Sequence, residues 1–412
     1  MAPADPPAAP HTDTPADMRT DQPRVTGTDA HRVTLAELAA DPHPHLARLR
    51  ARGPVVWVEA LGGWLVTARE SAVRVMRDAE TFTVDDPRFT TAKVIGPSML
   101  SLDGAEHGRH REPFVEPFKP RAVRAAFAGT IRAEADRLLD ALAPHGAGEL
   151  RRGFAGPLAA VVMADVLGLR DVPVPDVLGW YDAIVGAVDR LTRGEDAGAE
   201  GPAAYAALRE AVAATVGAKG AESLLEAASD RLGVGEIAAN AAVLLFGGIE
   251  TTEGMIVNAL YHLLSEPRLA NEVRADPALL DQAVEESLRL EPGAAVVDRY
   301  ATRDTELGGA RIGAGDLVTV SLAGANRDPE VFADPDRFDL GRANSRLQLA
   351  FAYGPHYCLG AHLARLEAVI ALRACFERLP GLRLDGTRPS HPYGLVFRKP
   401  PSLEARWDTG AA

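Results

Sequence analysis

The chain has 412 residues, of which 47% are hydrophobic, and this composition is typical of a soluble globular protein with a large core. It has 44 Lys and Arg against 57 Asp and Glu, a net charge of −13 with no basic run, which excludes a general nucleic-acid binder. Two cysteines are too few for a disulfide scaffold, an ordinary iron–sulfur cluster or a four-cysteine zinc site, so any redox metal must be held differently.

The first 31 residues contain six prolines and no apolar stretch, which predicts a disordered tail before one folded domain over residues 32–412. The tail lacks the basic start and the apolar run of a secretory signal, so we expect a cytoplasmic protein. The most apolar helical stretch, Ile237 to Ile249, has 13 residues, against the roughly 20 that span a bilayer. We therefore expect no membrane anchor.

Helix is expected to dominate the folded domain, with a small β region beside it. Val55–Val58 and Trp64–Val66 are rich in β-branched and aromatic residues and flank a Leu-Gly-Gly turn, which predicts a hairpin. From about residue 122 to 290 the pattern predicts successive Ala- and Leu-rich helices separated by Gly and Pro. Short strand patterns return near residues 294–299, 317–321 and 394–397. These patterns predict a mainly α fold with a minor β region.

A histidine and an arginine, His107 and Arg111, are four residues apart and share one face if their segment is helical. Pro113 and Pro117 follow them and are expected to kink such a helix. One interpretation is a pair of solvated surface charges. The other is a pair of donors for a bound anion, because arginine binds carboxylates well.

A long helix with a weak centre is predicted from Glu236 to Leu264. Its centre contains Gly247 and Gly248, and each mid-helix glycine costs roughly 1 kcal/mol relative to alanine. Thr251 lies four residues after Gly247, so its hydroxyl can bond back to that carbonyl and open a groove for water or dioxygen. Glu250 lies beside it as a candidate proton carrier. The alternative is a helix kinked for packing, with a solvated glutamate.

Three further patterns indicate structure rather than chemistry. The Gly-Val-Gly segment at 233–235 fits a loose dinucleotide fingerprint, but it follows a predicted helix and is interpreted as a helix start. His43 and His45 have no third ligand nearby, so we expect no metal site there. Glu286 and Arg289 are three apart on a predicted helix, which is ordinarily a surface pair contributing roughly 0.2–0.5 kcal/mol.

The loop that precedes the last predicted helix carries Cys358, with Gly354 four residues before it and Gly360 two residues after it. The loop brings the sulfur to a helix start, where the dipole and free N–H groups favour the thiolate, and the glycines let a flat ligand approach closely. A lone thiolate of this kind suits axial ligation of haem iron. The alternative is a buried cysteine that packs as a small hydrophobe, which is our interpretation of Cys375.

The segment from Phe351 to Glu367 resembles the haem-binding signature of the cytochrome P450 superfamily, and specifically its soluble bacterial haem-thiolate monooxygenases. The resemblance extends from about residue 32 to the C-terminus, with several motifs in the order of the family. Near the cysteine the chain departs from the family pattern at Ala352, where a glycine is usual, and at Gln348, where a histidine is common. Glu250 stands where the family has Asp or Glu.

The resemblance implies a haem b cofactor with Cys358 as the axial iron ligand. It also implies that Thr251 and Glu250 form an acid–alcohol pair that delivers protons during oxygen activation. The two haem propionates need cations or donors, and the candidates are His107, Arg111, Arg299 and His356.

The resemblance further implies a structural Glu–Arg–Arg network that positions the cysteine loop, with Glu286, Arg289 and Arg337 as its members. Substrate is expected to lie over the haem, against mostly small or aliphatic side chains. The residues that match the pocket positions of the family are Met99, Val243, Phe246, Gly247, Ala295, Val296 and Leu395.

The implied activity is a monooxygenase that inserts one oxygen atom from O2 into an apolar small molecule, by hydroxylation or epoxidation, in bacterial secondary metabolism. Because no flavin or nicotinamide fingerprint is credible, electrons must come from a separate ferredoxin or flavodoxin with an NAD(P)H-dependent reductase. We expect this partner to dock near Cys358, with Arg109 and Arg365 contributing. The alternatives are a peroxide-driven or oxidative-coupling enzyme on the same scaffold, and a non-catalytic haem-binding sensor or carrier.

Overall fold

The computed structural model describes residues 32–192, 194–217 and 224–409. Every helix and strand named below belongs to one unit, the second of the two into which the chain divides, which begins at Val33. The predicted N-terminal tail, residues 1–31, lies outside the described residues.

The main sheet has five strands in the order β1-β2-β8-β5-β3. The predicted hairpin is confirmed as β1 (Val55–Val58) and β2 (Gly63–Val66), and Gly62 between them has a φ of 62°, which favours glycine. The predicted strand at 317–321 is confirmed as β8 (Leu317–Ser321), parallel to β2. The remaining strands of this sheet are β5 (Val296–Ala301), antiparallel to β8, and β3 (Phe82–Thr83).

The expectation of a strand at 394–397 is wrong, because this segment forms only the isolated bridge between Ala294 and Phe397. Smaller strands form two further sheets, β4-β10-β9 and β6-β7. Their bounds are β4 (Ala147–Glu149), β6 (Thr305–Leu307), β7 (Ala310–Ile312), β9 (Arg383–Leu384) and β10 (Glu404–Arg406).

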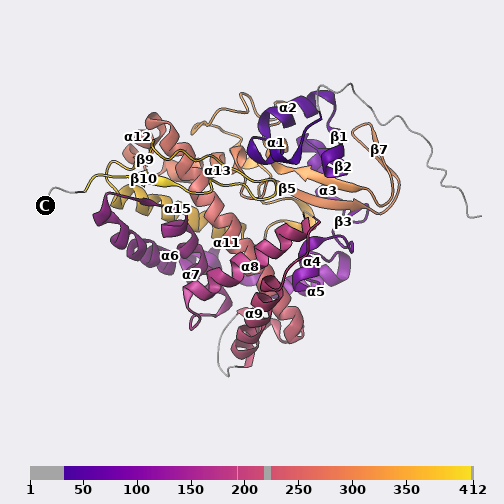
Figure 1. Ribbon diagram of the computed structural model, residues 1–412, viewed down its shortest axis with the longest axis horizontal. Coiled ribbons are helices and arrows are strands. Elements are labelled where there is room, and N and C mark those ends of the chain that lie inside the picture. Colours follow the sequence, from indigo (N-terminus) through magenta and orange to yellow (C-terminus); the bar gives the residue numbers. More distant parts are fainter. Residues whose placement is uncertain (1–31, 193, 218–223, 410–412) are drawn as a thin grey trace, which may run out of the picture. The chain divides into compact units, whose positions relative to one another are not determined.

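Helices make up most of the second unit. The long helices are α6 (Pro120–Leu142), α7 (Gly156–Leu167), α8 (Val174–Thr192), α9 (Glu200–Gly217), α11 (Val234–Ser265), α13 (Leu279–Leu290) and α15 (Ala361–Arg378). The other helices are α1 (Leu35–Ala40), α2 (His43–Arg52), α3 (Arg69–Arg77), α4 (Thr90–Ile95), α5 (Gly104–Val115), α10 (Leu224–Ala228), α12 (Pro267–Ala275) and α14 (Leu322–Ala325). In Figure 1 α6, α7, α8 and α9 lie below and to the left of the main sheet, whereas α1 and α2 lie above it.

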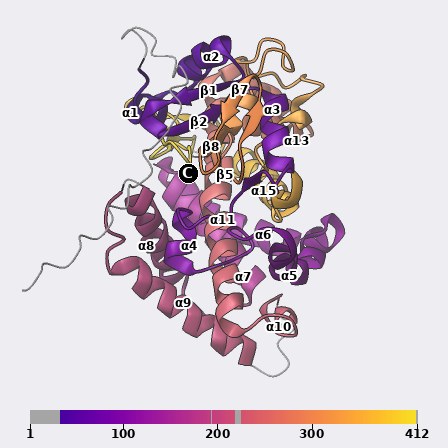
Figure 2. The same ribbon diagram turned by 90° about the vertical axis from the view of Figure 1, so that its right-hand side faces the viewer.

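Helix α11 is the central element, and the prediction of a long helix over Glu236 to Leu264 is confirmed. It passes between the other helices in Figure 2 and packs against α7, α8, α9, α13 and α15. Among the described residues it is the one helix long and apolar enough to cross a membrane, but most of its apolar stretch is buried inside the fold. This burial is typical of a core helix.

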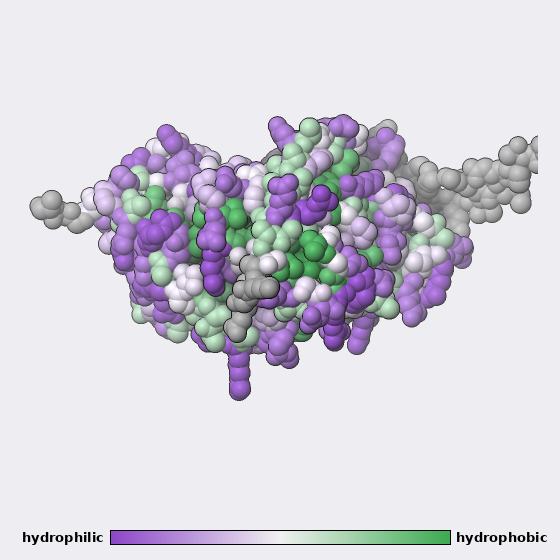
Figure 3. Space-filling view, turned by 90° about the horizontal axis from the view of Figure 1, so that it is seen from below, coloured by the Kyte–Doolittle hydropathy of each residue, from purple (hydrophilic) through white to green (hydrophobic). Residues whose placement is uncertain are grey.

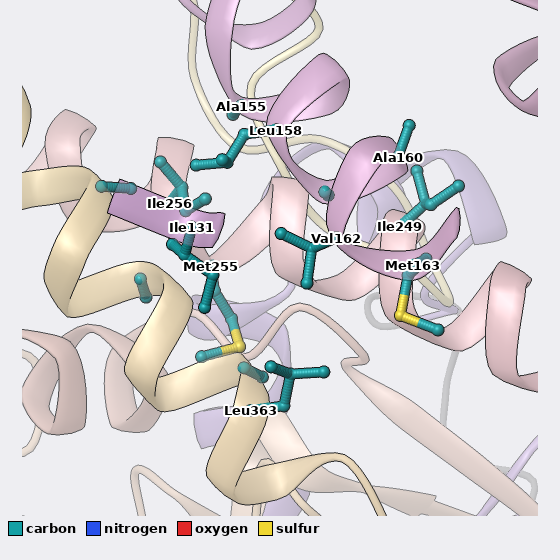
Figure 4. Packing of buried hydrophobic residues seen from close by; sticks show 14 of the residues in the cluster. Ile131, Ala155, Leu158, Ala160, Val162, Met163, Ile249, Met255, Ile256 and Leu363 are labelled. Carbon is teal, nitrogen blue, oxygen red and sulfur yellow. The ribbon is translucent and has the colours of Figure 1, made fainter. Parts of the chain in front are cut away.

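Buried hydrophobic side chains of α7, α11 and α15 belong to one core cluster, and Figure 4 shows several of them. Met163 of α7 lies against Gly248, where an added Cβ would come within 2.2 Å of the Met163 sulfur. Gly248 therefore lets α7 approach the centre of α11 closely. The surface is different: Figure 3 shows hydrophobic patches separated by hydrophilic side chains.

Candidate active site

The cysteine loop is closed by its own backbone. The amide of Cys358 donates to the carbonyl of Phe351 at 2.9 Å, and the loop then enters α15 at Ala361. Gly354 has a φ of 74°, and an added Cβ would lie 2.4 Å from the Met76 carbonyl oxygen, so this glycine is required where the loop meets α3. At Gly360, the N-cap of α15, an added Cβ would meet nothing within 4 Å, so there is open space at this glycine.

The two departures from the family pattern have distinct structural consequences. Ala352 has a φ of 58°, a left-handed conformation that costs a non-glycine residue roughly 1–2 kcal/mol. Gln348 connects the loop to α13, because its amide donates to Glu285 at 3.2 Å and its oxygen accepts from the Ala350 amide at 2.5 Å. The substituted alanine therefore strains the loop, whereas the substituted glutamine anchors it.

Burial raises the pKa of the Cys358 thiol, and this outweighs the Gly360 N–H, Arg111 and Arg365, which act in the opposite direction. The donors at the helix start, which we expected to favour the thiolate, do lower this pKa, but by less than the loss of hydration raises it. A bound metal ion supplies the missing positive charge, since a coordinating thiol is deprotonated.

Side chains of α5 reach the cysteine loop, where they meet a histidine of the loop itself. This helix continues through Pro113, so His107 and Arg111 do share a face, and the expected kink does not separate them. Arg111 donates to the Tyr357 carbonyl at 2.6 Å, and the rings of His107 and His356 lie 4.3 Å apart. His356 is hydrogen-bonded to Asp103 at 2.8 Å. The predicted donors thus meet beside the cysteine loop.

Two buried donors in this region lack the anion that such groups normally bind. Burial together with His356 and Arg111 lowers the pKa of His107 to about 4, and its buried Nε2 has no hydrogen-bond partner among the described residues. Arg299 of β5 is 4% exposed, and its guanidinium donates to the backbone carbonyl of Asp298 at 2.7 Å. Burial lowers the pKa of Arg299 to about 10.

An isolated buried cation is costly unless an anion pairs with it. No carboxylate of the described residues forms an ion pair with Arg299 or Arg111. The donor set of Arg299, Arg111, His107 and His356, near a loop that carries a sulfur ligand, fits a dianionic group held at Cys358. The residues therefore fit haem with its two propionates.

The centre of α11 has the predicted weak point. The Thr251 hydroxyl donates to the Gly247 carbonyl at 2.6 Å, so this predicted bond is confirmed. At Gly247 an added Cβ would meet nothing within 4 Å, in contrast with the close packing at Gly248. The two adjacent glycines thus differ in role. Gly248 allows α7 to pack closely against α11, whereas the absence of a side chain at Gly247 leaves space unfilled.

Glu250 is buried, which contradicts the alternative of a solvated glutamate. Its Oε2 accepts from the Tyr181 hydroxyl of α8, and its Oε1 lies 2.8 Å from the Lys399 ammonium. Lys399 also pairs with Glu253, one turn further along α11. Sequence reasoning missed Tyr181, Glu253 and Lys399, because they carry no motif and come together only through the fold.

The Glu–Arg–Arg network exists, but its second arginine is Arg342 and not Arg337 as predicted. Glu286 receives a bidentate pair from Arg289 at 2.9 and 2.8 Å, and Arg342 donates to it at 2.8 Å. Arg337 is exposed, and its backbone carbonyl accepts from both arginines, at 3.0 and 3.2 Å. A turn in the chain after residue 337 directs the next arginine inward, which residue spacing did not reveal.

The predicted pocket residues come from four segments of the chain. Phe246 of α11 contacts Phe397 edge-to-face, with ring centroids 5.2 Å apart. The Ala295 amide, just before β5, donates to the Val396 carbonyl at 2.8 Å, and Val296 and Leu395 adjoin this contact. Met99 is attached to α11 through its amide, which donates to Asn240 at 2.8 Å. Val243 and Gly247 lie on α11 on either side of Phe246 in sequence.

A groove of about 660 Å³ lies against α6, α13 and α15 and reaches Tyr357, beside Cys358. Arg365 borders it and pairs with Glu285 at 2.5 Å. Arg109, which we expected near this face, is bound to Glu236 at 2.6 Å and does not line the groove. Three more arginines border the groove: Arg124 of α6, Arg346, and Arg373 of α15.

His43 and His45 each contact a charged side chain, and for His45 this is Arg48 at 2.8 Å. His43 is paired with Glu291 at 3.0 Å. In the part of the chain that the structure describes, no group of three or more His, Cys, Asp or Glu residues could hold a metal ion. The Gly-Val-Gly segment begins α11, with Gly233 as its N-cap, as predicted.

Comparison with known proteins gives a consistent result. The family described as cytochrome P450 matches residues 218–402. The cytochrome P450 monooxygenase PikC of Streptomyces venezuelae is 37% identical over 394 residues, covering 91% of this chain and 93% of that protein. Nocardicin C N-oxygenase of Nocardia uniformis subsp. tsuyamanensis is 36% identical, with coverage of 90% and 96%.

A solved structure shares the fold as well. The post-tailoring hydroxylase HmtN, involved in himastatin biosynthesis, has a TM-score of 0.78 and 30% identity, covering 91% of this chain and all of that chain. Similarity of this extent covers the cysteine loop, α11 and the sheet together. The chain therefore belongs to the cytochrome P450 family of haem-thiolate monooxygenases.

Proposed function

We propose that the enzyme inserts one oxygen atom from O2 into an apolar small molecule, by hydroxylation or epoxidation, in bacterial secondary metabolism. The observation that carries this proposal is the Thr251 hydroxyl bonded to the Gly247 carbonyl, next to Glu250 on the central helix. A hydroxyl bonded to the carbonyl one turn earlier, with a buried carboxylate next to it in sequence, can take part in proton transfer. The relatives named above support the metabolic setting.

Haem b, when bound at Cys358, supplies dioxygen binding and one-electron chemistry that no side chain provides. The protein holds this group through the sulfur and orients it through the propionates. Arg299 and Arg111 offer guanidinium groups for bidentate pairing, and His107 offers its unpartnered Nε2. His356 is fixed by Asp103 and keeps its ring against His107.

Substrate specificity is proposed to depend on the apolar residues next to α11. Phe246 and Phe397 form an aromatic wall, and Ala295 and Met99 are small or flexible side chains that leave room. The remaining members, Val243, Gly247, Val296 and Leu395, add aliphatic or no side-chain surface. These residue types favour an apolar substrate of moderate bulk.

Electrons are proposed to come from a ferredoxin or flavodoxin with its NAD(P)H-dependent reductase, in the cytoplasm. The groove beside Tyr357 supports this, because several arginines border it although the chain carries a net charge of −13. A local positive surface attracts and orients an acidic partner. Arg365 is held in place by Glu285 and by its contact with the Phe351 ring at 4.3 Å.

The decisive experiment is the absorption spectrum of the reduced, carbon-monoxide-bound protein, with Cys358→Ala as the control. We expect a strongly red-shifted band in the wild-type protein and its loss in the variant, because the thiolate changes the electronic structure of the haem. Cys375→Ala, at a buried cysteine of α15, is the matched control and should keep the band. A wild-type protein without the band would refute haem-thiolate ligation.

The source of electrons that supports turnover distinguishes an enzyme that activates O2 from a peroxide-driven enzyme. Turnover with ferredoxin, reductase and NAD(P)H supports the proposal, and turnover with peroxide alone supports the peroxide-driven alternative. Binding of small organic molecules that shifts the haem spin state favours an enzyme, whereas a response to diatomic gases alone favours a sensor. Thr251→Ala should release peroxide in place of product, because it removes the proton-donating hydroxyl.

A further inference from the structure

Asn240, near the start of α11, is a buried amide whose oxygen and nitrogen both have partners. Its Oδ1 accepts from the Met99 amide at 2.8 Å, and its Nδ2 donates to the Glu236 carbonyl at 2.9 Å and lies 3.0 Å from Nδ1 of His110. These partners belong to three parts of the chain: the segment between α4 and α5, helix α5, and the first turn of α11. Asn240 therefore joins Met99 to both α5 and α11.

The directions of these hydrogen bonds follow from the chemistry of their groups. A backbone N–H only donates, so the oxygen of the Asn240 amide faces Met99 and its NH2 group faces His110. Nδ1 of His110 is then the acceptor, and the ring proton lies on Nε2, 3.4 Å from the Glu236 carboxylate. Arg109 also approaches Nε2, at 3.2 Å, but a guanidinium has no acceptor, so the carboxylate is the acceptor here. His110 thus fixes the orientation of the Asn240 amide.

Met99 lies in a short turn between α4 and α5. The Ser101 amide closes this turn by donating to the Ser98 carbonyl at 3.0 Å. Asp103, the N-cap of α5, holds the end of the segment through its hydrogen bond to the cysteine loop. Among the described residues, the bond from Met99 to Asn240 is the one hydrogen bond between this turn and α11. The position of Met99 relative to α11 therefore depends on Asn240.

Met99 adjoins the residues of the proposed substrate pocket. It belongs to the same buried cluster as Phe246, and Val243 and Phe397 pack against this cluster. A methionine side chain has three rotatable bonds and adapts its shape to its surroundings. The space that Met99 occupies is therefore set mainly by where its backbone is held.

We propose that Asn240 and His110 are positioning residues for substrate specificity. Asn240 holds the backbone of Met99 against α11, and His110 keeps the Asn240 amide in the orientation that accepts this bond. Both residues act through Met99, and together they limit the bulk of the apolar ligand that fits beside it. The inference rests on the proposed function, because it takes Met99 as a member of the substrate pocket.

Substitutions in this network separate positioning from a general loss of stability. Asn240→Leu removes the acceptor of the Met99 amide, and His110→Leu removes the acceptor that orients Asn240. His110→Gln offers an amide oxygen in place of Nδ1 and is the conservative variant. Asn258→Leu is the matched control, because Asn258 is an equally buried amide of α11 that donates to two backbone carbonyls elsewhere.

The first measurement is hydrogen–deuterium exchange of the Met99 amide in the holoprotein. We expect this exchange to become about 2–10-fold faster in Asn240→Leu, the factor that corresponds to loss of one ordinary hydrogen bond. His110→Leu should accelerate it by a smaller factor, and His110→Gln and Asn258→Leu should leave it near the wild-type rate. Unchanged exchange in Asn240→Leu, or an equal acceleration in Asn258→Leu, overturns the proposal.

The second measurement is ligand binding, with imidazole and 4-phenylimidazole as probes that differ by one aromatic ring. Both bind haem iron through a nitrogen, so the ratio of their dissociation constants, from optical titration of the holoprotein, reports steric access to the iron. In Asn240→Leu we expect this ratio to shift by about 2–10-fold in favour of the larger azole, because displacing Met99 no longer breaks its hydrogen bond. His110→Leu should shift the ratio in the same direction by less.

A double-mutant cycle shows whether the effect passes through Met99. In a Met99→Ala background, Asn240→Leu should not shift the azole ratio further. An azole ratio that stays at the wild-type value in Asn240→Leu, or that shifts equally in the Met99→Ala background, overturns the proposal. If Asn240→Leu does not fold, the difference between His110→Leu and His110→Gln decides. Turnover with ferredoxin, reductase and NAD(P)H tests the proposed function separately, because neither amide exchange nor azole binding depends on electron transfer.

Discussion

Two buried glutamates, Glu286 on α13 and Glu250 on α11, are surrounded by cations in different ways. Glu286 is bound by two arginines and by the Asp339 amide at 3.1 Å. Glu250 is bound by a lysine and a tyrosine. The remaining N–H groups of the two arginines at Glu286 donate to backbone carbonyls, which belong to Asn326, Ala333, Asp334, Pro335 and Arg337.

The difference indicates which network is rigid and which can rearrange. Planar guanidinium groups in bidentate pairs have fixed geometry, and backbone acceptors cannot move away from them. Asn326 extends the Glu286 network to the cysteine loop, because its side chain accepts from the Leu349 amide at 2.6 Å. By contrast, the flexible ammonium of Lys399 is shared between the carboxylates of Glu250 and Glu253. Oε1 of Glu253 lacks a hydrogen bond among the described residues.

The largest expected effect comes from breaking the rigid network. Arg289→Met should lower the free energy of unfolding by about 3–5 kcal/mol, because it leaves Glu286 buried with an incomplete set of partners. Arg342→Met should have an effect of similar sign and smaller size, and Arg337→Met should change stability by less than about 0.5 kcal/mol, since its side chain is exposed. Chemical denaturation of the holoproteins measures all three. Equal losses for Arg337 and Arg342 would contradict the corrected network.

A smaller effect is expected from removing the hydroxyl of Tyr181, the uncharged side chain among the buried group of Tyr181, Glu250, Glu253 and Lys399. Tyr181→Phe removes a hydroxyl that donates to the Glu250 carboxylate, and should cost about 1.5–3 kcal/mol, the usual range for a hydrogen bond to a charged group. Tyr261→Phe, which removes an exposed hydrogen bond to His391, is the matched control and should cost about 0.5–1.5 kcal/mol. Thermal and chemical denaturation provide the comparison. A smaller loss for Tyr181 than for Tyr261 would show that the cluster rearranges around the missing hydroxyl.

The smallest effect is expected within the cysteine loop. Ala352→Gly relieves about 1–2 kcal/mol of left-handed strain but adds freedom to the unfolded chain, so the net gain should stay below about 1 kcal/mol. Gly354→Ala should destabilise the protein, because its Cβ would clash with the Met76 carbonyl. The midpoint of denaturation and the intensity of the carbon monoxide band measure both. A loss of stability in Ala352→Gly would show that the alanine side chain contributes packing that outweighs its strain.

Predictions from the sequence succeeded where the chemistry depends on residues close together in the chain. The bond from Thr251 to Gly247 spans one helical turn, so the spacing alone was sufficient. The pairing of Glu286 with Arg289 is also local. The prediction of Arg337 as the second arginine failed because a turn determines which side chain points inward. Arg337 and Arg342 are five residues apart in the sequence, and the path of the loop directs Arg342 to Glu286.

The sequence by itself determined the helical class of the fold, the glycine-flanked cysteine before α15 and the weakened centre of α11. These features arise from periodicity and from spacings of a few residues, which fix backbone geometry directly. Only the tertiary structure brought Lys399 and Tyr181 to Glu250, across 149 and 69 residues of chain. Burial likewise decided that the Cys358 thiol has a raised pKa, because loss of hydration depends on everything packed around a group and not on its neighbours in sequence.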